Sequence, residues 1–194
     1  MEVDMYKIIA IIGEAGSGKD TIMRRVLEAA PHLHEIVSCT TRPPREGEID
    51  GVNYHFMSPE CFGDKVLHGE MLEASCFNNW FYGTGYESLR SDCVNIGVFN
   101  PEGVESLLAH KGVDVDVYYL RVSDKNRLLR QLNRESDPDV SEIIRRFKAD
   151  MIDFENIDFE HTELQNNTLK DMEKAINTIV EAYPADSGLD RALI

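Results

Sequence analysis

The sequence predicts an α/β fold in which a parallel sheet carries helices on both faces. Three observations lead to this prediction. Apolar, strand-like runs alternate with helix-like segments, the first run leads directly into a glycine-rich loop, and a long stretch over 38–84 interrupts the alternation. Alternating strands and helices favour a parallel sheet, because each return to the sheet needs a crossover. We therefore expect a three-layer core with an inserted lobe that has its own small sheet.

The strands are expected where apolar, aromatic and β-branched residues cluster. The first is the run Tyr-Lys-Ile-Ile-Ala-Ile-Ile, and the long strand that starts at Val113 alternates Val and Tyr with Asp. In chain order, the expected strands cover residues 6–12, 35–37, 71–77, 80–82, 93–99, 113–122 and 159–164. Residues 38–58 are polar and rich in glycine and proline, so we expect mostly irregular structure there.

The helices are expected between these strands. Pro31 ends the first helix, whereas Pro59 and Pro101 each suit the first position of a helix. In chain order, the expected helices cover residues 20–29, 59–68, 101–110, 124–134, 139–155 and 169–182. Glu-Ser-Asp-Pro at 135–138 separates the fourth helix from the fifth.

Length and charge limit the class of protein. The chain has 194 residues, which suggests one domain, and a formal net charge of −15. This acidity argues against nonspecific binding to nucleic acid and against anionic membrane surfaces. No apolar run approaches the ~20 residues that cross a membrane, and the first residues lack a signal-peptide pattern. We expect a cytoplasmic monomer or homodimer.

The spacing of the cysteines and the uneven distribution of charge further limit the ligands that we expect. The four cysteines lack the spacing of metal ligands and are expected to be reduced. Acidic residues accumulate from residue 150 onward, whereas arginines gather in the 38–56 stretch and over residues 130–146. An acidic body with a local basic cluster suits a small polyanion such as a nucleotide. The alternative is that the acidic face only keeps the protein in solution.

A phosphate-binding loop is predicted directly after the first strand. Its glycines allow backbone N–H groups to turn toward phosphate oxygens, the helix N-terminus adds partial positive charge, and Lys19 can reach the terminal phosphates. The alternative is a turn that binds nothing, but the strand, the spacing and the helix all favour a phosphate cradle. The cradle comprises Gly13, Glu14, Ala15, Gly16, Ser17, Gly18, Lys19, Asp20 and Thr21.

A second motif lies between residues 38 and 56. Arg42 and Arg45 form a stiff fork with prolines between them, and arginine donors match phosphate oxygens. Alone, this pattern would also fit a surface loop with scattered charges. However, Thr40 to Phe56 matches every fixed position of T-T-R-x-P-R-x-G-E-x-x-G-x-x-Y-x-F. The chain therefore resembles the guanylate kinase family, and with the upstream loop in register the similarity covers nearly the whole chain.

The resemblance implies a P-loop nucleoside monophosphate kinase that transfers a phosphoryl group from ATP to GMP or dGMP with Mg²⁺ as cofactor. It implies a core (1–37, 85–134 and 157–194), a monophosphate-binding lobe (38–84) and a helical lid (135–156). Catalytic roles would fall to Lys19, Arg134 and Arg146, and ATP would be bound by the loop residues and Asn166. The implied acceptor site comprises Ser38, Arg42, Arg45, Tyr54, Glu73, Tyr82, Thr84 and Asn100.

The chemistry of Glu73 agrees with its implied place beside guanine. Guanine presents N1–H and an exocyclic amine on one edge, and one carboxylate can accept both hydrogen bonds. Adenine has an acceptor at N1, which leaves a buried acceptor unpaired at a cost of about 1–3 kcal/mol or more. The alternative is that Glu73 is an exposed glutamate on a strand.

The lid matches the family less closely. Arg134 and Arg146 correspond best to the family's lid arginines, which neutralise the transferring phosphoryl group, and Arg130 is a further candidate. Alternatively, Arg145 and Arg146 lie on an exposed helix face and pair with Glu142 or Asp150 at helical spacing.

Two departures from the family concern the metal. The family usually has Ser or Thr directly after the cradle lysine, where this chain has Asp20. The family's L-D-x-D-x-Q-G pattern is replaced by Gly97 to Gly103, with Val98 and Asn100 at the two acidic positions. We hypothesise that Asp20 supports the Mg²⁺ that the strand end no longer holds. The alternative is an acid in the first helical turn that the helix dipole favours.

Other functions remain open at this point. A related kinase could phosphorylate another small acceptor, such as a different deoxynucleotide or a ribose bisphosphate. The third possible function is that of a non-catalytic guanylate-kinase-like binding module. Such modules typically lose the cradle lysine and glycines, which this chain keeps.

Overall fold

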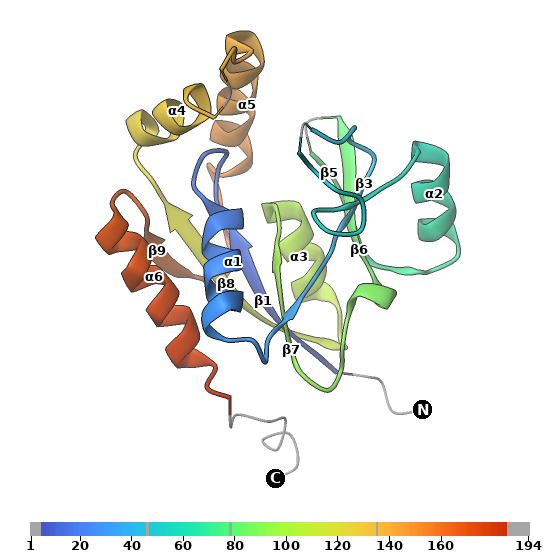
Figure 1. Ribbon diagram of the computed structural model, residues 1–194. Helices are drawn as coiled ribbons and strands as arrows, with labels where there is room; N and C mark the ends of the chain where they lie inside the picture. Colours follow the sequence, from blue (N-terminus) through green and yellow to red (C-terminus); the bar gives the residue numbers. More distant parts are fainter. Residues whose placement is uncertain (1–4, 46, 78, 135, 186–194) are drawn as a thin grey trace.

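The computed structural model describes residues 5–45, 47–77, 79–134 and 136–185. Within these residues, the core is a parallel sheet of five strands in the order β2-β7-β1-β8-β9 (Figure 1). The strands are β1 (Tyr6–Ile12), β2 (His34–Glu35), β7 (Val94–Val98), β8 (Val113–Arg121) and β9 (Thr162–Gln165). Because β1 is the central strand, the loop that follows it lies at the middle of the carboxyl end of the sheet.

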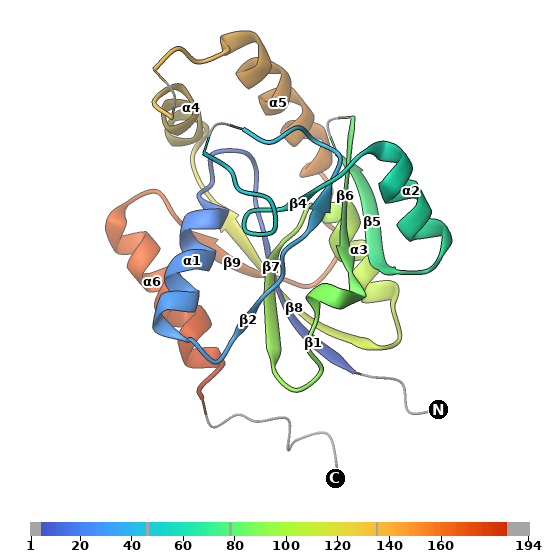
Figure 2. The ribbon, with the colours of Figure 1, turned by 45° about the vertical axis from the view of Figure 1, so that its right-hand side comes forward.

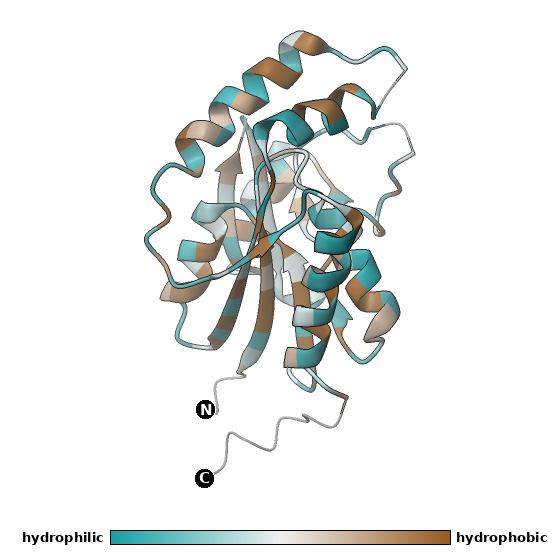
Figure 3. Cartoon of the chain, turned by 90° about the vertical axis from the view of Figure 1, so that its left-hand side faces the viewer, coloured by the Kyte–Doolittle hydropathy of each residue, from teal (hydrophilic) through white to brown (hydrophobic). Residues whose placement is uncertain are grey.

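Helices cover both faces of this sheet. α1 (Lys19–Ala29) and α6 (Leu169–Ala182) pack on the face that receives Ile9 and Ile11 of β1. α3 (Pro101–Ala109) packs on the opposite face with Ile8 and Ile12. Successive strand residues point to opposite faces, which explains this division. Hydrophobic colour accordingly follows the strands in Figure 3. The predicted α/β class is confirmed.

A second, mixed sheet lies within the predicted lobe. Its four strands within the described residues have the order β4-β3-β6-β5. They are β3 (Cys39–Thr40), β4 (His55–Phe56), β5 (Met71–Phe77) and β6 (Trp80–Gly85). α2 (Pro59–Leu67) and the short 3-10 helix η1 (Tyr86–Ser88) accompany them. Phe62 of α2 stacks on Phe81 with ring centroids 5.6 Å apart, which fixes this helix against the small sheet.

Two further helices stand across the phosphate loop from the small sheet. α4 (Asp124–Leu132) begins at the N-cap Ser123, and α5 (Val140–Asp153) begins at the N-cap Asp139. In Figure 2, α4 and α5 rise on one side and the small sheet with α2 on the other. The loop after β1 therefore lies between two sets of elements outside the core.

The expected elements agree with the structure except at a few places. The strand expected over 35–37 instead covers His34–Glu35. The N–H of Ile36 still donates to Ile96 O, and the chain leaves the sheet after this bond. The two-residue strands β3 and β4 were not predicted. The division into core, lobe and lid stays a prediction, and residues 1–4, 46, 78, 135 and 186–194 of those ranges lie outside the described residues. No helix in the described part of the chain is long and apolar enough to cross a membrane.

Candidate active site

Glycines shape the loop between β1 and α1. Gly16 and Gly18 have φ of 81° and 91°, in the left-handed region that favours glycine. A Cβ on Gly16 would lie 2.7 Å from the carbonyl oxygen of Arg127, and one on Gly18 would lie 2.8 Å from Nδ2 of Asn166. The loop thus passes too close to its neighbours for a side chain at either position.

Side chains from other elements hold the carbonyl groups of this loop. Arg130 of α4 donates to the carbonyl oxygens of Gly16 and Ser17, each at 3.3 Å. Asn166 Nδ2, just after β9, donates to Ser17 O at 2.7 Å. The first turn of α1 has N–H groups without intrahelical partners, so the loop and this turn form a region that can bind an anion. Asn166, expected to bind ATP, lies against the loop itself and is 4% exposed.

Lys19 is folded back over the loop. Its Nζ donates to Gly13 O at 2.6 Å and to Glu14 O at 3.3 Å. Burial lowers the pKa of Lys19, while the carboxylates of Asp20, Asp150 and Glu14 act in the opposite direction. The loop therefore contains a poorly solvated cation that a phosphate group could neutralise.

Asp20 stands in the first turn of α1, beside Lys19, and is exposed. No described residue forms a hydrogen bond or ion pair with its carboxylate, and no group of three His, Cys, Asp or Glu among the described residues could hold a metal. An exposed carboxylate near a phosphate site fits Mg²⁺, which takes one or two carboxylates and completes its shell with phosphate oxygens and water.

Arg42 is fixed by its surroundings. Its Nη1 and Nη2 donate to Glu48 Oε2 and Oε1, both at 2.9 Å, in a bidentate pair. Its guanidinium carbon lies 5.4 Å from the ring centroid of Tyr54 and 5.7 Å from that of Phe56. Glu48 also accepts from the backbone N–H of Arg45 at 2.7 Å, so one carboxylate orients both arginines of the fork.

Other predicted acceptor residues gather around this fork. The rings of Tyr54 and Tyr82 lie edge to face, 6.1 Å apart. Burial raises the pKa of Tyr54 well above its usual range, so its hydroxyl keeps its proton and can donate. Ser38 precedes β3, and its carbonyl oxygen accepts from His55 N–H at 2.9 Å. These contacts bring the tyrosines to the arginine fork and tie Ser38 to the start of β4.

Glu73 is buried, so the alternative that it is an exposed glutamate on a strand is wrong. It is 7% exposed and accepts a 2.8 Å hydrogen bond from Thr84 Oγ1. Burial raises the pKa of Glu73 to about 7. Asn100 lies nearby as the N-cap of α3, and its Oδ1 accepts from Ser75 Oγ and Gly103 N–H. Glu73 and Asn100 both approach Gly103, where a Cβ would meet an oxygen of each side chain.

The lid arginines approach the arginine fork. Burial lowers the pKa of Arg45, and the positive charges of Arg42, Arg146 and Arg134 lower it further, so these cations share one region. Arg146 Nε donates to Glu142 Oε1 at 2.7 Å, and Arg145 pairs with the same carboxylate. A cavity of about 590 Å³ lies between fork and lid, lined by Arg42, Pro43, Arg45, Asn79, Trp80, Glu142, Arg145 and Arg146.

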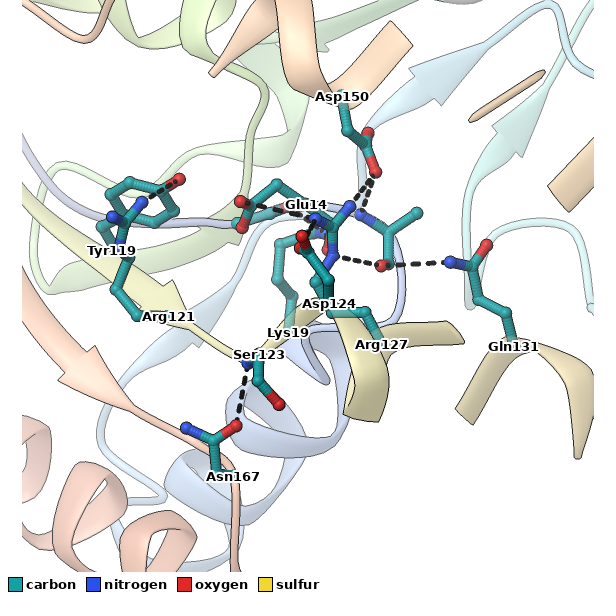
Figure 4. A network of polar contacts seen from close by, with 12 residues as sticks. Glu14, Lys19, Tyr119, Arg121, Ser123, Asp124, Arg127, Gln131, Asp150 and Asn167 are labelled. Atoms are coloured by element: carbon teal, nitrogen blue, oxygen red, sulfur yellow. Dashed lines mark hydrogen bonds and ion pairs between the residues drawn. The ribbon is translucent and has the colours of Figure 1, made fainter. Parts of the chain in front are cut away.

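Sequence reasoning missed one pair of residues at this site. Asp150, in the sequence only one possible partner of Arg145 or Arg146 on an exposed helix face, is buried and pairs with Arg127 at 2.6 Å. Figure 4 shows Arg127 and Asp150 converging on the phosphate loop beside Glu14 and Lys19. Helical spacing alone could not reveal this contact, because it joins two different helices.

The fold and the site together define a P-loop kinase fold: a phosphate loop at the end of a central parallel strand, faced by an arginine-rich region outside the core. The guanylate kinase family model matches residues 5–183. The chain belongs to the guanylate kinase family.

Individual relatives agree with this assignment. A guanylate kinase of Helicobacter hepaticus is 31% identical over 135 residues, covering 67% of this chain and 68% of that protein. A guanylate kinase of Chlorobium luteolum is 45% identical over 84 residues, and one of Nostoc is 43% identical over 83. These two matches span less than half of the relatives' length, 43% and 42%. The fold resembles a guanylate kinase structure from Anaplasma phagocytophilum, with a TM-score of 0.70, 18% identity, and coverage of 96% and 91% of the two chains.

Proposed function

We propose that this protein transfers the γ-phosphoryl group of ATP to GMP or dGMP, giving ADP and the nucleoside diphosphate. The observation that carries the proposal is a buried carboxylate, Glu73, bonded to Thr84 on the small sheet that also carries the Arg42–Arg45 fork. A single carboxylate can accept both donors of the guanine edge, whereas adenine offers an acceptor at the same place.

Phosphoryl transfer of this kind needs no covalent intermediate on the enzyme. An oxygen of the acceptor phosphate attacks the γ-phosphorus in line, and catalysis consists of positioning and charge neutralisation. Lys19 would hold the donor phosphates, the fork would hold the acceptor phosphate, and Arg134 and Arg146 would neutralise the transferring group. Closure of the two lobes would exclude water, which otherwise hydrolyses ATP.

A coupled assay of ADP formation tests the proposal, with ATP and each of the four common nucleoside monophosphates and their deoxy forms. We expect GMP and dGMP to be turned over at least about a hundredfold faster than AMP, because the carboxylate would face an acceptor on adenine. Turnover of a different acceptor would favour the related kinases. Nucleotide binding without turnover of any acceptor would favour a binding module.

Mg²⁺ would be held by Asp20 together with the ATP phosphates, and it would neutralise charge on the transferring group. Replacing Asp20 with Asn is expected to lower turnover by about tenfold or more and to raise the Mg²⁺ concentration needed for half-maximal rate, because a carboxylate ligand is lost. A Mg²⁺ titration at fixed ATP measures both effects. An unchanged titration curve would reject the role of Asp20.

Acceptor binding is expected to weaken in acid because guanine needs the ionised form of Glu73. As pH falls through about 7, this carboxyl takes up a proton and loses its capacity to accept two hydrogen bonds. Between pH 8 and pH 6, KM for GMP should therefore rise about tenfold.

The acceptor phosphate itself titrates near pH 6, so the test needs a matched variant. Glu73→Gln lacks the titrating carboxyl and should bind GMP weakly at both pH values, with only the small change that belongs to the phosphate. Equal pH dependence in the wild-type protein and in Glu73→Gln would contradict the prediction.

A further inference from the structure

One buried ion pair holds both backbone polar groups of Ala15, within the first half of the phosphate loop. The N–H of Ala15 donates to Asp150 Oδ2 at 2.8 Å, and Arg127 Nε donates to the carbonyl oxygen of Ala15 at 3.2 Å. Arg127 Nη2 and Asp150 Oδ2 lie 2.6 Å apart. Arg127 comes from α4 and Asp150 from α5, so these contacts tie the loop to two helices outside the core sheet (Figure 4).

The pair is almost completely buried. The side chains of Arg127 and Asp150 are 3% and 1% exposed, and the ring of Phe147 lies 4.5 Å from the guanidinium carbon of Arg127. Asp150 Oδ1 is buried without a hydrogen-bond partner. Two charges in such a place carry a desolvation cost that a well-packed apolar pair avoids, so fold stability does not account for the pair.

Other contacts hold the loop in a different way. Arg130 and Asn166 hold only carbonyl groups of Gly16 and Ser17, and Gln131 adds a longer bond of 3.4 Å to Ala15 O. Among the described residues, Asp150 is the one side chain that accepts from a backbone N–H of the glycine-rich segment 13–18. The ion pair therefore fixes the orientation of the peptide groups on both sides of Ala15.

We propose that Arg127 and Asp150 are positioning residues that hold the phosphate loop in the conformation that receives ATP. This inference rests on the proposed function only in taking ATP as the ligand of the loop. A loop that is ordered before ATP arrives avoids an ordering cost during binding, and this saving appears as affinity. The acceptor site on the small sheet makes no contact with the pair in the structure's described residues, so GMP affinity should not depend on it.

Direct binding of a non-hydrolysable ATP analogue, measured by calorimetry without any acceptor, tests the proposal. In Asp150→Ala, Kd for the analogue should rise about tenfold or more, while Kd for GMP stays within about twofold. Asp153→Ala is the matched control, because Asp153 lies on the same helix and is exposed. Circular dichroism establishes that each variant is folded at the temperature used. Unchanged analogue affinity in folded Asp150→Ala would overturn the proposal.

The double variant Arg127→Leu with Asp150→Ala separates positioning from fold stability. Because it removes both charges of the pair together, neither is left buried without the other, so it should melt closer to the wild-type protein than Asp150→Ala does. Its affinity for the analogue should nevertheless stay reduced about fivefold or more, since the N–H of Ala15 has lost its partner and its carbonyl oxygen keeps only the longer bond from Gln131. Wild-type affinity in this variant would mean that Arg127 and Asp150 only compensate each other's charge, and it would overturn the proposal.

The proposed function and the positioning role of the ion pair can be refuted separately. A wild-type protein that binds the analogue but does not phosphorylate GMP would refute the proposed acceptor and leave the role of the pair open to the same binding test. A wild-type protein that phosphorylates GMP, together with variants that bind the analogue normally, would refute the positioning role alone.

Discussion

Replacing Lys19 with Met is expected to lower the turnover number about a thousandfold, because phosphoryl transfer depends on neutralising charge on the phosphates. Lys19 is the cation of the loop itself, with its Nζ 2.6 Å from Gly13 O. Methionine keeps the length of the side chain and removes only the charge and the donors. Steady-state kinetics with ATP and GMP give the turnover number.

Stability provides an independent check on Lys19→Met. Burial lowers the pKa of Lys19, which means that the folded protein disfavours its charge. Removing that charge should leave the melting temperature unchanged or higher, so any loss of activity would not come from unfolding. Lys174→Met, at an exposed position on α6, is the matched control. A Lys19→Met variant with more than a tenth of wild-type turnover would contradict the assigned role.

Replacing Arg146 with Ala should also lower turnover about a thousandfold, which is the effect expected of an arginine that stabilises the transferring phosphoryl group. Arg146 contributes to lowering the pKa of Arg45, so it lies close to the acceptor fork. It also lines the cavity between the fork and α5. The loss should appear in the turnover number rather than in KM, because the interaction would form only in the transition state.

Arg145 is the matched control for this variant. Arg145 and Arg146 are neighbours on α5, and both pair with Glu142. These pairs are partly exposed and contribute little to stability, so breaking them affects both variants similarly. We expect Arg145→Ala to keep turnover within about threefold of wild type. Equal losses in the two variants would mean that the effect comes from Glu142 or the helix rather than from a catalytic arginine.

The elements of the fold followed from the sequence where the signals were local. β1 is a run of apolar residues broken only by Lys7, and Pro59 and Pro101 open α2 and α3 as expected. The strands β3 and β4 were missed because two-residue strands are defined by their partners, not by their own pattern. Cys39 of β3, for example, pairs with Gly83 and His55, which are far away in the sequence.

The site was predictable where it lies within one motif and not where it joins distant segments. The phosphate loop and the Arg42–Arg45 fork are short motifs whose residues are neighbours in the chain. The burial of Asp150 depends on Arg127, 23 residues earlier on another helix. Because Asp150 lies at helical spacing from Arg146, the sequence instead allowed an exposed ion pair between these two residues. Packing between α4 and α5, which no local pattern encodes, decides its position.

The central claim is that two anion-binding regions face each other, one for each nucleotide, with a guanine selector beside the second. A crystal structure with GMP and a non-transferable ATP analogue tests it most directly. We predict the triphosphate on the loop from Gly13 to Lys19, the GMP phosphate on the Arg42–Arg45 fork, and the guanine edge on Glu73. GMP bound elsewhere, or a guanine edge that does not meet Glu73, would contradict the account.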